Sequence, residues 1–251
     1  MVTNRKVYKL EFKINSMNRR DFLKVASLGL ASALVAKRTY SDESRRVVLT
    51  FDDNPFEIER TARLVKILKE NGFQNSQFYL TGEGIIEQPE STKYLAENNF
   101  EIGWHSMQHN VMRKNSPQEL IKDIDEWKRT LDKAVPGYES RLARFPYGAG
   151  TREQINILEG EGLSIYPCAG RGVHPYNWDV DTEDWNPEGV YSVEKINQEA
   201  DKFKDSPVIL FHQKLAKPYQ NKRKPEMPTV TKSLIVGDLD NFERYVREIK
   251  K

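Results

Sequence analysis

Short apolar runs alternate with amphipathic segments from Ser41 to the end of the 251-residue chain, and this alternation restricts the possible folds more than any other feature. Four of the runs have the length and composition of β-strands: residues 46–51, 77–81, 163–167 and 207–211. Parallel strands joined by crossover helices produce this order of elements. About 210 residues of the pattern fit one α/β domain. A (β/α) barrel is favoured over an open doubly wound sheet.

Helices are predicted between the strands from capping residues and apolar spacing. Ser116 and Glu119 form a capping box with Pro117 at the first helical position, and apolar residues follow on one face. Thr151 and Gln154 form a second capping box, for a helix that ends near residue 160. Three more amphipathic helices are expected, at residues 57–70, 192–203 and 239–249.

Polar side chains that follow predicted strands are the first candidates for function, because chemistry in α/β folds collects at the carboxyl ends of strands. Asp52 and Asp53 directly follow the first strand, and His105 and His109 follow the apolar segment 100–104. The i,i+4 spacing of the histidines places both imidazoles on one face of a helix, where they can bind one metal ion. One aspartate then supplies a third ligand, and the other is free to act as a base on metal-bound water. Taken alone, each pair also fits a solvated turn or surface.

Three further segments carry candidate residues. His212 follows the run 207–211 and suits a general acid, although a structural histidine fits as well. Arg144 can pair with a carboxylate, and the Pro-Tyr-Gly turn at 146–148 can present a backbone amide to an oxyanion. Acids beside an aromatic at residues 181–185 can hold a histidine's proton and wall a sugar site, or form a solvated loop. The single cysteine excludes an intramolecular disulfide and a Cys-rich zinc module, so any metal must be bound by His and carboxylates.

Five short motifs occur in order, and together they resemble those of the polysaccharide deacetylase family, also called carbohydrate esterase family 4 or the NodB homology domain. The motifs are Thr50-Phe51-Asp52-Asp53, His105-Ser106-Met107-Gln108-His109, Arg144-Phe145-Pro146-Tyr147, Asp181-Thr182-Glu183-Asp184-Trp185 and Leu210-Phe211-His212. The resemblance covers residues 47–212. It implies a distorted (β/α)7 barrel and a metal-dependent hydrolase that removes acetyl groups from glycans containing N-acetylhexosamine, or less often from O-acetylated xylan.

The resemblance also implies which residues bind the metal and move protons. Asp53, His105 and His109 are the implied ligands of a divalent metal, usually zinc (Zn²⁺). Asp52 is the implied general base and His212 the implied general acid.

Five other residues are expected to support this chemistry. The resemblance implies that Arg144 orients the base and that Asp184 tunes the acid. The backbone N–H of Tyr147 is expected to stabilise the oxyanion, and Trp185 and Leu210 are expected to line the acetyl pocket.

Other functions fit the same residues. The scaffold could hydrolyse an O-acetyl ester or a non-sugar amide, and an inactive glycan- or metal-binding protein is an alternative of another class. The implied base, acid and their two partners argue against the inactive alternative, because binding alone needs none of them. The basic, proline-bearing stretch 214–228 could border the substrate groove, but we expect a solvated loop.

Residues 1–36 are predicted to be an N-terminal extension with an export signal, followed by a linker at 37–45 and the catalytic domain at 46–251. The apolar stretch 25–36 is shorter than the roughly 20 residues of a membrane-spanning helix, so no stable span is expected after cleavage. Arg19 and Arg20, followed by Phe-Leu-Lys, precede this stretch, and small residues end it. The order resembles a twin-arginine signal, which implies a periplasmic or extracellular protein. A buried amphipathic helix is the alternative.

The export signal accounts for the basic charge of the chain. The whole chain has a net charge of +2, with 39 Lys+Arg and 37 Asp+Glu. Residues 1–33 alone carry +5, so a chain cleaved after Ala33 has a net charge of −3. A mildly acidic mature protein gives no indication of nucleic-acid binding and suits an acetylated glycan as partner.

Overall fold

The computed structural model describes residues 47–170, 172–174, 177–227 and 229–249. The predicted extension and export signal at 1–36 and the predicted linker at 37–45 lie outside the described residues.

Seven parallel strands form the central sheet, in the order β5-β4-β3-β2-β1-β7-β6. The strands are β1 (Val48–Asp53), β2 (Gln77–Leu80), β3 (Glu101–Trp104), β4 (Leu142–Ala143), β5 (Ser164–Ile165), β6 (Val180–Asp181) and β7 (Val208–His212). Among the described residues no ladder joins the edge strands β5 and β6, so the sheet is an open, distorted (β/α)7 barrel. This confirms the expected fold class.

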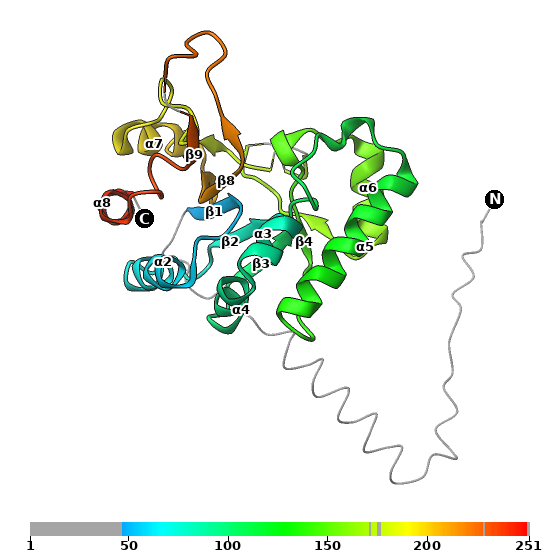
Figure 1. Cartoon of the computed structure of the whole chain (residues 1–251). Helices are drawn as coiled ribbons and strands as arrows, with labels where there is room; N and C mark the ends of the chain where they lie inside the picture. The colour runs from blue at the N-terminus through cyan, green and yellow to red at the C-terminus, as the bar shows by residue number, and fades with distance from the viewer. Residues whose placement is uncertain (1–46, 171, 175–176, 228, 250–251) are drawn as a thin grey trace, which may run out of the picture. The chain divides into compact units, whose positions relative to one another are not determined.

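Helices follow one another along the sheet in nearly the order of the strands. They are α2 (Ile58–Glu70), α3 (Gly82–Glu87), α4 (Pro89–Glu97), α5 (Pro117–Ala134), α6 (Arg152–Gly160), α7 (Val193–Ala200) and α8 (Leu239–Glu248). Helix α8 contacts α2, α2 contacts α4, α4 contacts α5 and α5 contacts α6 (Figure 1). Both predicted capping boxes form, at the starts of α5 and α6. Helices α3 and α4 were not predicted from the sequence.

Strand β1 shows how the sheet separates its core from its functional face. Phe51 packs on Phe242 of α8, with 5.7 Å between ring centroids, so it faces the helices. Its neighbours Thr50 and Asp52 point the other way and both contact Arg144, which is fully buried. This alternation follows from the pleat of a strand, in which successive side chains point to opposite faces. Polar groups therefore collect on the inner face of the barrel.

Only part of the stretch 214–228 is the solvated loop expected from the sequence, because residues 214–219 form a strand while residues 222–226 are exposed and belong to no strand. Strand β8 (Lys214–Tyr219) and strand β9 (Val230–Lys232) pair in antiparallel fashion. Leu215 is 6% exposed and anchors the hairpin, and Asn54 at the end of β1 forms a bridge with Lys214. The pattern of this stretch is dominated by basic side chains, and among its described residues Leu215 is the one buried apolar position, so the pattern shows little sign of a strand. In the described part of the chain, no helix has the length and apolar character needed to cross a bilayer.

Candidate active site

A cavity of about 450 Å³ lies at the carboxyl ends of the inner strands. Its polar lining includes the expected site residues Asp52, Asp53, His105, His109 and His212, together with Asp181 and Lys217. Aromatic and apolar side chains complete it, among them Tyr147, Trp178, Trp185, Leu210, Leu215 and Tyr219. Eight of the ten residues singled out in the sequence thus share one cavity, and the other two, Arg144 and Asp184, contact residues that line it.

Two consecutive carboxylates face the cavity because the backbone changes direction at Asp53. In a regular strand, Asp52 and Asp53 would point to opposite faces. Asp53 has a φ of 77°, in the left-handed region that aspartate adopts more readily than most residues. Both residues are 3% exposed, so both carboxylates are buried at the cavity. The turn at the strand end, rather than the strand itself, makes the pair.

The two histidines do not lie on a helix, so that expectation was wrong. Residues 105–109 form a loop in which Ser106 and His109 have φ values of 61° and 51°. The two left-handed residues fold the loop so that the imidazoles of His105 and His109 still meet, with 5.0 Å between ring centroids. Nε2 of His105 lies 3.5 Å from Oδ1 of Asp53, and Nε2 of His109 lies 3.1 Å from the same oxygen.

These three residues fit a divalent metal ion. One ligand atom from each of Asp53, His105 and His109 lies within 4.8 Å of the others. Oδ1 of Asp53 is buried and accepts no hydrogen bond from the described residues. Nδ1 of His105 lies 2.9 Å from the backbone carbonyl of Arg144, so it carries the proton and leaves Nε2 free as a ligand. An oxygen and two imidazole nitrogens are a ligand set typical of zinc.

The charge states of the cluster also suit metal binding, which requires neutral imidazole and ionised carboxylate. Burial lowers the pKa of His109 to about 4, although the neighbouring Asp53 opposes the shift. Burial by itself would raise the pKa of Asp53, but the imidazoles of His109 and His105 favour its ionised form and hold its pKa below the usual range.

Arg144 positions Asp52 from the interior of the barrel. Its Nη1 donates to Oδ1 of Asp52 at 2.6 Å and to Oγ1 of Thr50 at 2.9 Å. Its Nε and Nη2 donate to the side-chain and backbone oxygens of Asn177, both at 2.9 Å. The guanidinium also lies over the ring of Tyr79, 4.1 Å from the centroid. No motif indicated Asn177, because its role depends on how the chain between the strands folds back.

His212 and Asp184 form a second pair of oppositely charged side chains at the cavity. Nδ1 of His212 lies 2.7 Å from Oδ1 of Asp184, which is fully buried. Oδ2 of Asp184 accepts from the backbone N–H of His212 at 3.0 Å and from the hydroxyl of Ser233. Burial alone would lower the pKa of His212, but the charge and hydrogen bond of Asp184, with smaller contributions from Asp53 and Asp52, raise it to about 10. The imidazole is therefore held in its protonated form.

The β8–β9 hairpin contributes to the site in a way that the sequence did not indicate. The backbone N–H of Ala216 donates to Oδ2 of Asp53 at 3.1 Å, so the hairpin orients one of the metal-binding candidates. Tyr219 packs edge-on against Trp185, with 5.2 Å between ring centroids, and both rings line the cavity.

Tyr147, in the turn after Arg144, also lies beside the metal-binding candidates. It has a φ of 58° and packs against His109, with 4.5 Å between ring centroids.

Comparisons with known proteins agree with this geometry. The chain is 27% identical to a chitooligosaccharide deacetylase of Rhizobium leguminosarum bv. phaseoli, over 65% of this chain and 66% of that protein. It is 24% identical to the peptidoglycan-N-acetylmuramic acid deacetylase PdaC of Bacillus subtilis, over 72% of this chain and 35% of that protein. A solved pseudoenzyme of carbohydrate esterase family 4 from Bacillus anthracis has the same fold, with a TM-score of 0.58, 20% identity and coverage of 82% of this chain and 61% of its own.

The matches therefore span about two thirds of the first relative and about a third of the second. The family model for polysaccharide deacetylases matches residues 39–165, just over half of the chain. That segment contains both aspartates of β1, the two histidines and Arg144. The chain belongs to the polysaccharide deacetylase family.

Proposed function

We propose that this protein is a metal-dependent deacetylase that hydrolyses the acetamide of N-acetylhexosamine residues in a glycan. One observation supports this proposal above all others. The cluster of Asp53, His105 and His109 lies in one cavity with Asp52 and His212. Asp52 is paired with the guanidinium of Arg144, and His212 is paired with the carboxylate of Asp184. A metal-dependent hydrolase uses this combination of a metal site, a base and an acid.

Asp52 is the proposed general base. When bound, a divalent cation, proposed to be zinc, polarises the acetyl carbonyl and lowers the pKa of a bound water. Arg144 holds Oδ1 of Asp52, while Oδ2 lies 3.6 Å from Nε2 of His105 and thus next to the metal ligands. Oδ2 is in position to accept the proton of the attacking water.

His212 is the proposed general acid. Its Nδ1 is bound to Asp184, which leaves Nε2 as the nitrogen that can donate a proton to the leaving amine. The raised pKa, about 10, keeps the imidazolium available across the neutral range. We further propose that the backbone N–H of Tyr147 donates to the developing oxyanion, and that Trp185 and Leu210 enclose the acetyl methyl group.

The proposed substrate is a polymer of the cell envelope or of the environment, either chitin-like or peptidoglycan. The relatives described above act, by their names, on chitooligosaccharides and on peptidoglycan. The paired rings of Trp185 and Tyr219 at the cavity provide the apolar surface on which a sugar ring can stack. The sequence of residues 1–36 supports export by the twin-arginine route, to the periplasm or the exterior.

Acetate release from a panel of glycans tests the proposal. The full chain, loaded with zinc, is incubated with chitin oligomers, peptidoglycan and acetylated xylan, and the metal-free chain and the Asp52→Asn variant serve as controls. Acetate from an N-acetylated substrate, only with metal and only with Asp52, is the expected result. Release from xylan alone would show an O-acetyl esterase instead. No release from any of these glycans by a zinc-loaded chain would contradict the proposal and favour either a non-sugar amide as substrate or an inactive protein, such as the pseudoenzyme described above.

Export is tested separately. Replacement of Arg19 and Arg20 by lysine is expected to retain the protein inside the cell, as measured by fractionation, and unchanged export would exclude the twin-arginine route.

A further inference from the structure

We propose that Asp123 of helix α5 is a positioning residue that holds the loop 105–109 in the conformation required for metal binding. The inference rests on the metal site proposed above, but it concerns the loop and not the chemistry. Asp123 does not line the active-site cavity and reaches the metal ligands indirectly, through Trp104 and the backbone of Met107.

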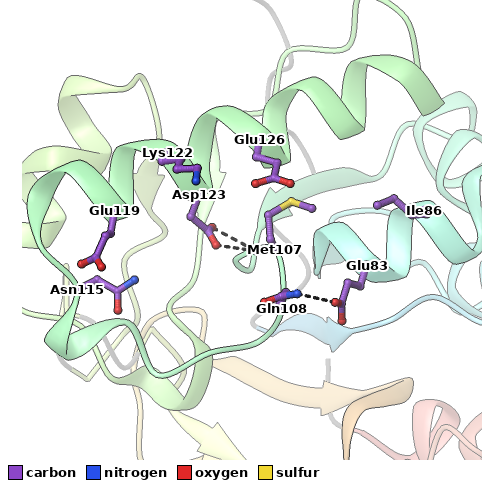
Figure 2. A pocket seen from close by; sticks show the side chains of 9 residues that line it. All are labelled: Glu83, Ile86, Met107, Gln108, Asn115, Glu119, Lys122, Asp123 and Glu126. Carbon is purple, nitrogen blue, oxygen red and sulfur yellow. Dashed lines mark hydrogen bonds between the residues drawn. The ribbon is translucent and has the colours of Figure 1, made fainter.

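The carboxylate of Asp123 is bound to the chain on both sides of His105. Its Oδ1 and Oδ2 accept from the backbone N–H of Met107 at 3.2 and 3.1 Å (Figure 2). Its Oδ1 also accepts from Nε1 of Trp104 at 2.9 Å. Trp104 is the last residue of β3 and directly precedes the first histidine, and Met107 lies midway between the two histidines. One side chain thus connects the end of the strand to the middle of the loop.

The loop needs such support because of its backbone. Ser106 and His109 both have positive φ, and non-glycine residues keep this conformation only where the surrounding structure fixes it. An extended backbone at these two positions would separate the imidazoles. The N–H of Met107 lies between the two strained residues, so holding it restricts both.

Helix α3 supports the opposite side of the loop. The backbone N–H groups of Gly82 and Glu83 donate to the carbonyls of Ser106 and Met107, each at 3.0 Å. A Cβ at Gly82 would lie 2.1 Å from Sδ of Met107, so the loop is pressed against the start of α3. Glu83 also accepts from Nε2 of Gln108 at 3.0 Å (Figure 2). The carbonyls are therefore held by α3, and the amide of Met107 is held by Asp123.

A carboxylate suits this position better than an amide. Two N–H donors converge on Asp123, and both of its oxygens accept. An asparagine would have one acceptor oxygen, and its NH₂ group would face a donor. Glu126 provides a matched control, because it lines the same 390 Å³ cavity as Asp123 (Figure 2), and among the described residues its side chain makes no hydrogen bond to the loop.

The test compares Asp123→Asn with Glu126→Gln in the full chain. The dissociation constant for zinc is measured by competition with a chromogenic chelator. Asp123→Asn is expected to weaken zinc binding by about 10- to 100-fold, as loss of a group that orients metal ligands commonly does. Glu126→Gln is expected to change it by less than about twofold. Asp123→Glu, which keeps both acceptor oxygens, is expected to restore part of the affinity. Equal zinc affinities for Asp123→Asn and Glu126→Gln would overturn the proposal.

Amide hydrogen exchange of the metal-free wild type gives a second readout, which does not depend on any variant folding. The N–H of Met107 is expected to be protected before metal is added, because Asp123 holds it in the absence of the ion. Rapid exchange of Met107 in the metal-free chain would refute the proposal. A chain that binds zinc with the expected variant effects but releases no acetate would contradict the proposed function and leave this inference standing. If the wild type releases acetate and Asp123→Asn keeps full zinc affinity, this inference is contradicted and the proposed function stands.

Discussion

The Asp184→Asn substitution tests whether an anion keeps His212 protonated. The two side chains lie 2.7 Å apart, and Asp184 is the main contributor that raises the pKa of His212 to about 10. The proposed acid acts in its protonated form, so a raised pKa preserves activity as the pH rises until it approaches that value. Removal of the negative charge is expected to move the alkaline limb of the activity profile to lower pH.

The size of the effect follows from the fraction of protonated imidazole. Without Asp184 the pKa of His212 is expected to fall toward its ordinary value of about 6.5, because burial disfavours the charged ring while Asp53 and Asp52 still favour it. At about pH 8 the protonated fraction then falls from nearly all to about 3%, which predicts a loss of about 30-fold in kcat. At about pH 6 roughly three quarters of the imidazole is still protonated, and the loss is below about twofold. The loss of kcat in the variant therefore becomes steadily smaller as the pH is lowered.

The assay is kcat for acetate release across this pH range, for the wild type and the variant, both saturated with zinc. A bound metal ion lowers the pKa of His212 in both proteins, so the difference between them reports the charge of Asp184. Zinc affinity and the unfolding midpoint serve as controls, because Asp184 also accepts from Ser233. A variant that loses the same factor at every pH, or that keeps the wild-type alkaline limb, would refute the role assigned to the pair.

Three other substitutions or treatments have expected outcomes. Asp52→Asn should lower kcat by about 10²- to 10⁴-fold with zinc affinity nearly unchanged, since this carboxylate is the proposed base and not a ligand; a near-wild-type rate would exclude it as the base. Chelation should abolish acetate release, and re-added zinc at about 100 times its dissociation constant should stabilise the fold by about 2.7 kcal/mol, measured by denaturant unfolding. Arg144→Met should cost about 3–5 kcal/mol in the same measurement, because Asp52 is left buried without its cation; a loss below about 1 kcal/mol would contradict this.

Periodicity and capping predicted much of the barrel, because those signals are local. The two capping boxes and the run 207–211 correspond closely to α5, α6 and β7. The hairpin of β8 and β9 was missed, because its strands are exposed along most of their length and carry little apolar alternation. Its stability depends on Leu215 and on pairing with the end of β1, which are tertiary contacts.

At the site, too, the sequence predicted which residues take part but not the backbone conformation that brings them together. Motifs indicated which side chains would share a cavity, but the backbone that brings them together was mispredicted at 105–109. The spacing of His105 and His109 is that of a helix face, yet left-handed residues in a loop bring the rings together equally well. Side chains at i and i+4 can thus meet by two different routes, and residue spacing alone does not distinguish them.

The arrangement of buried charges argues for catalysis over simple binding. Asp52 and His212 are paired positions on the adjacent strands β1 and β7, yet each has a buried partner of opposite charge, Arg144 for one and Asp184 for the other. Burying a charge costs free energy unless it is fully paired, so a site that only held a glycan would not need Arg144 or Asp184. Their effect is to hold a proton acceptor and a proton donor in opposite protonation states within one cavity. A reaction that moves a proton from water to a leaving amine requires that difference, and binding does not.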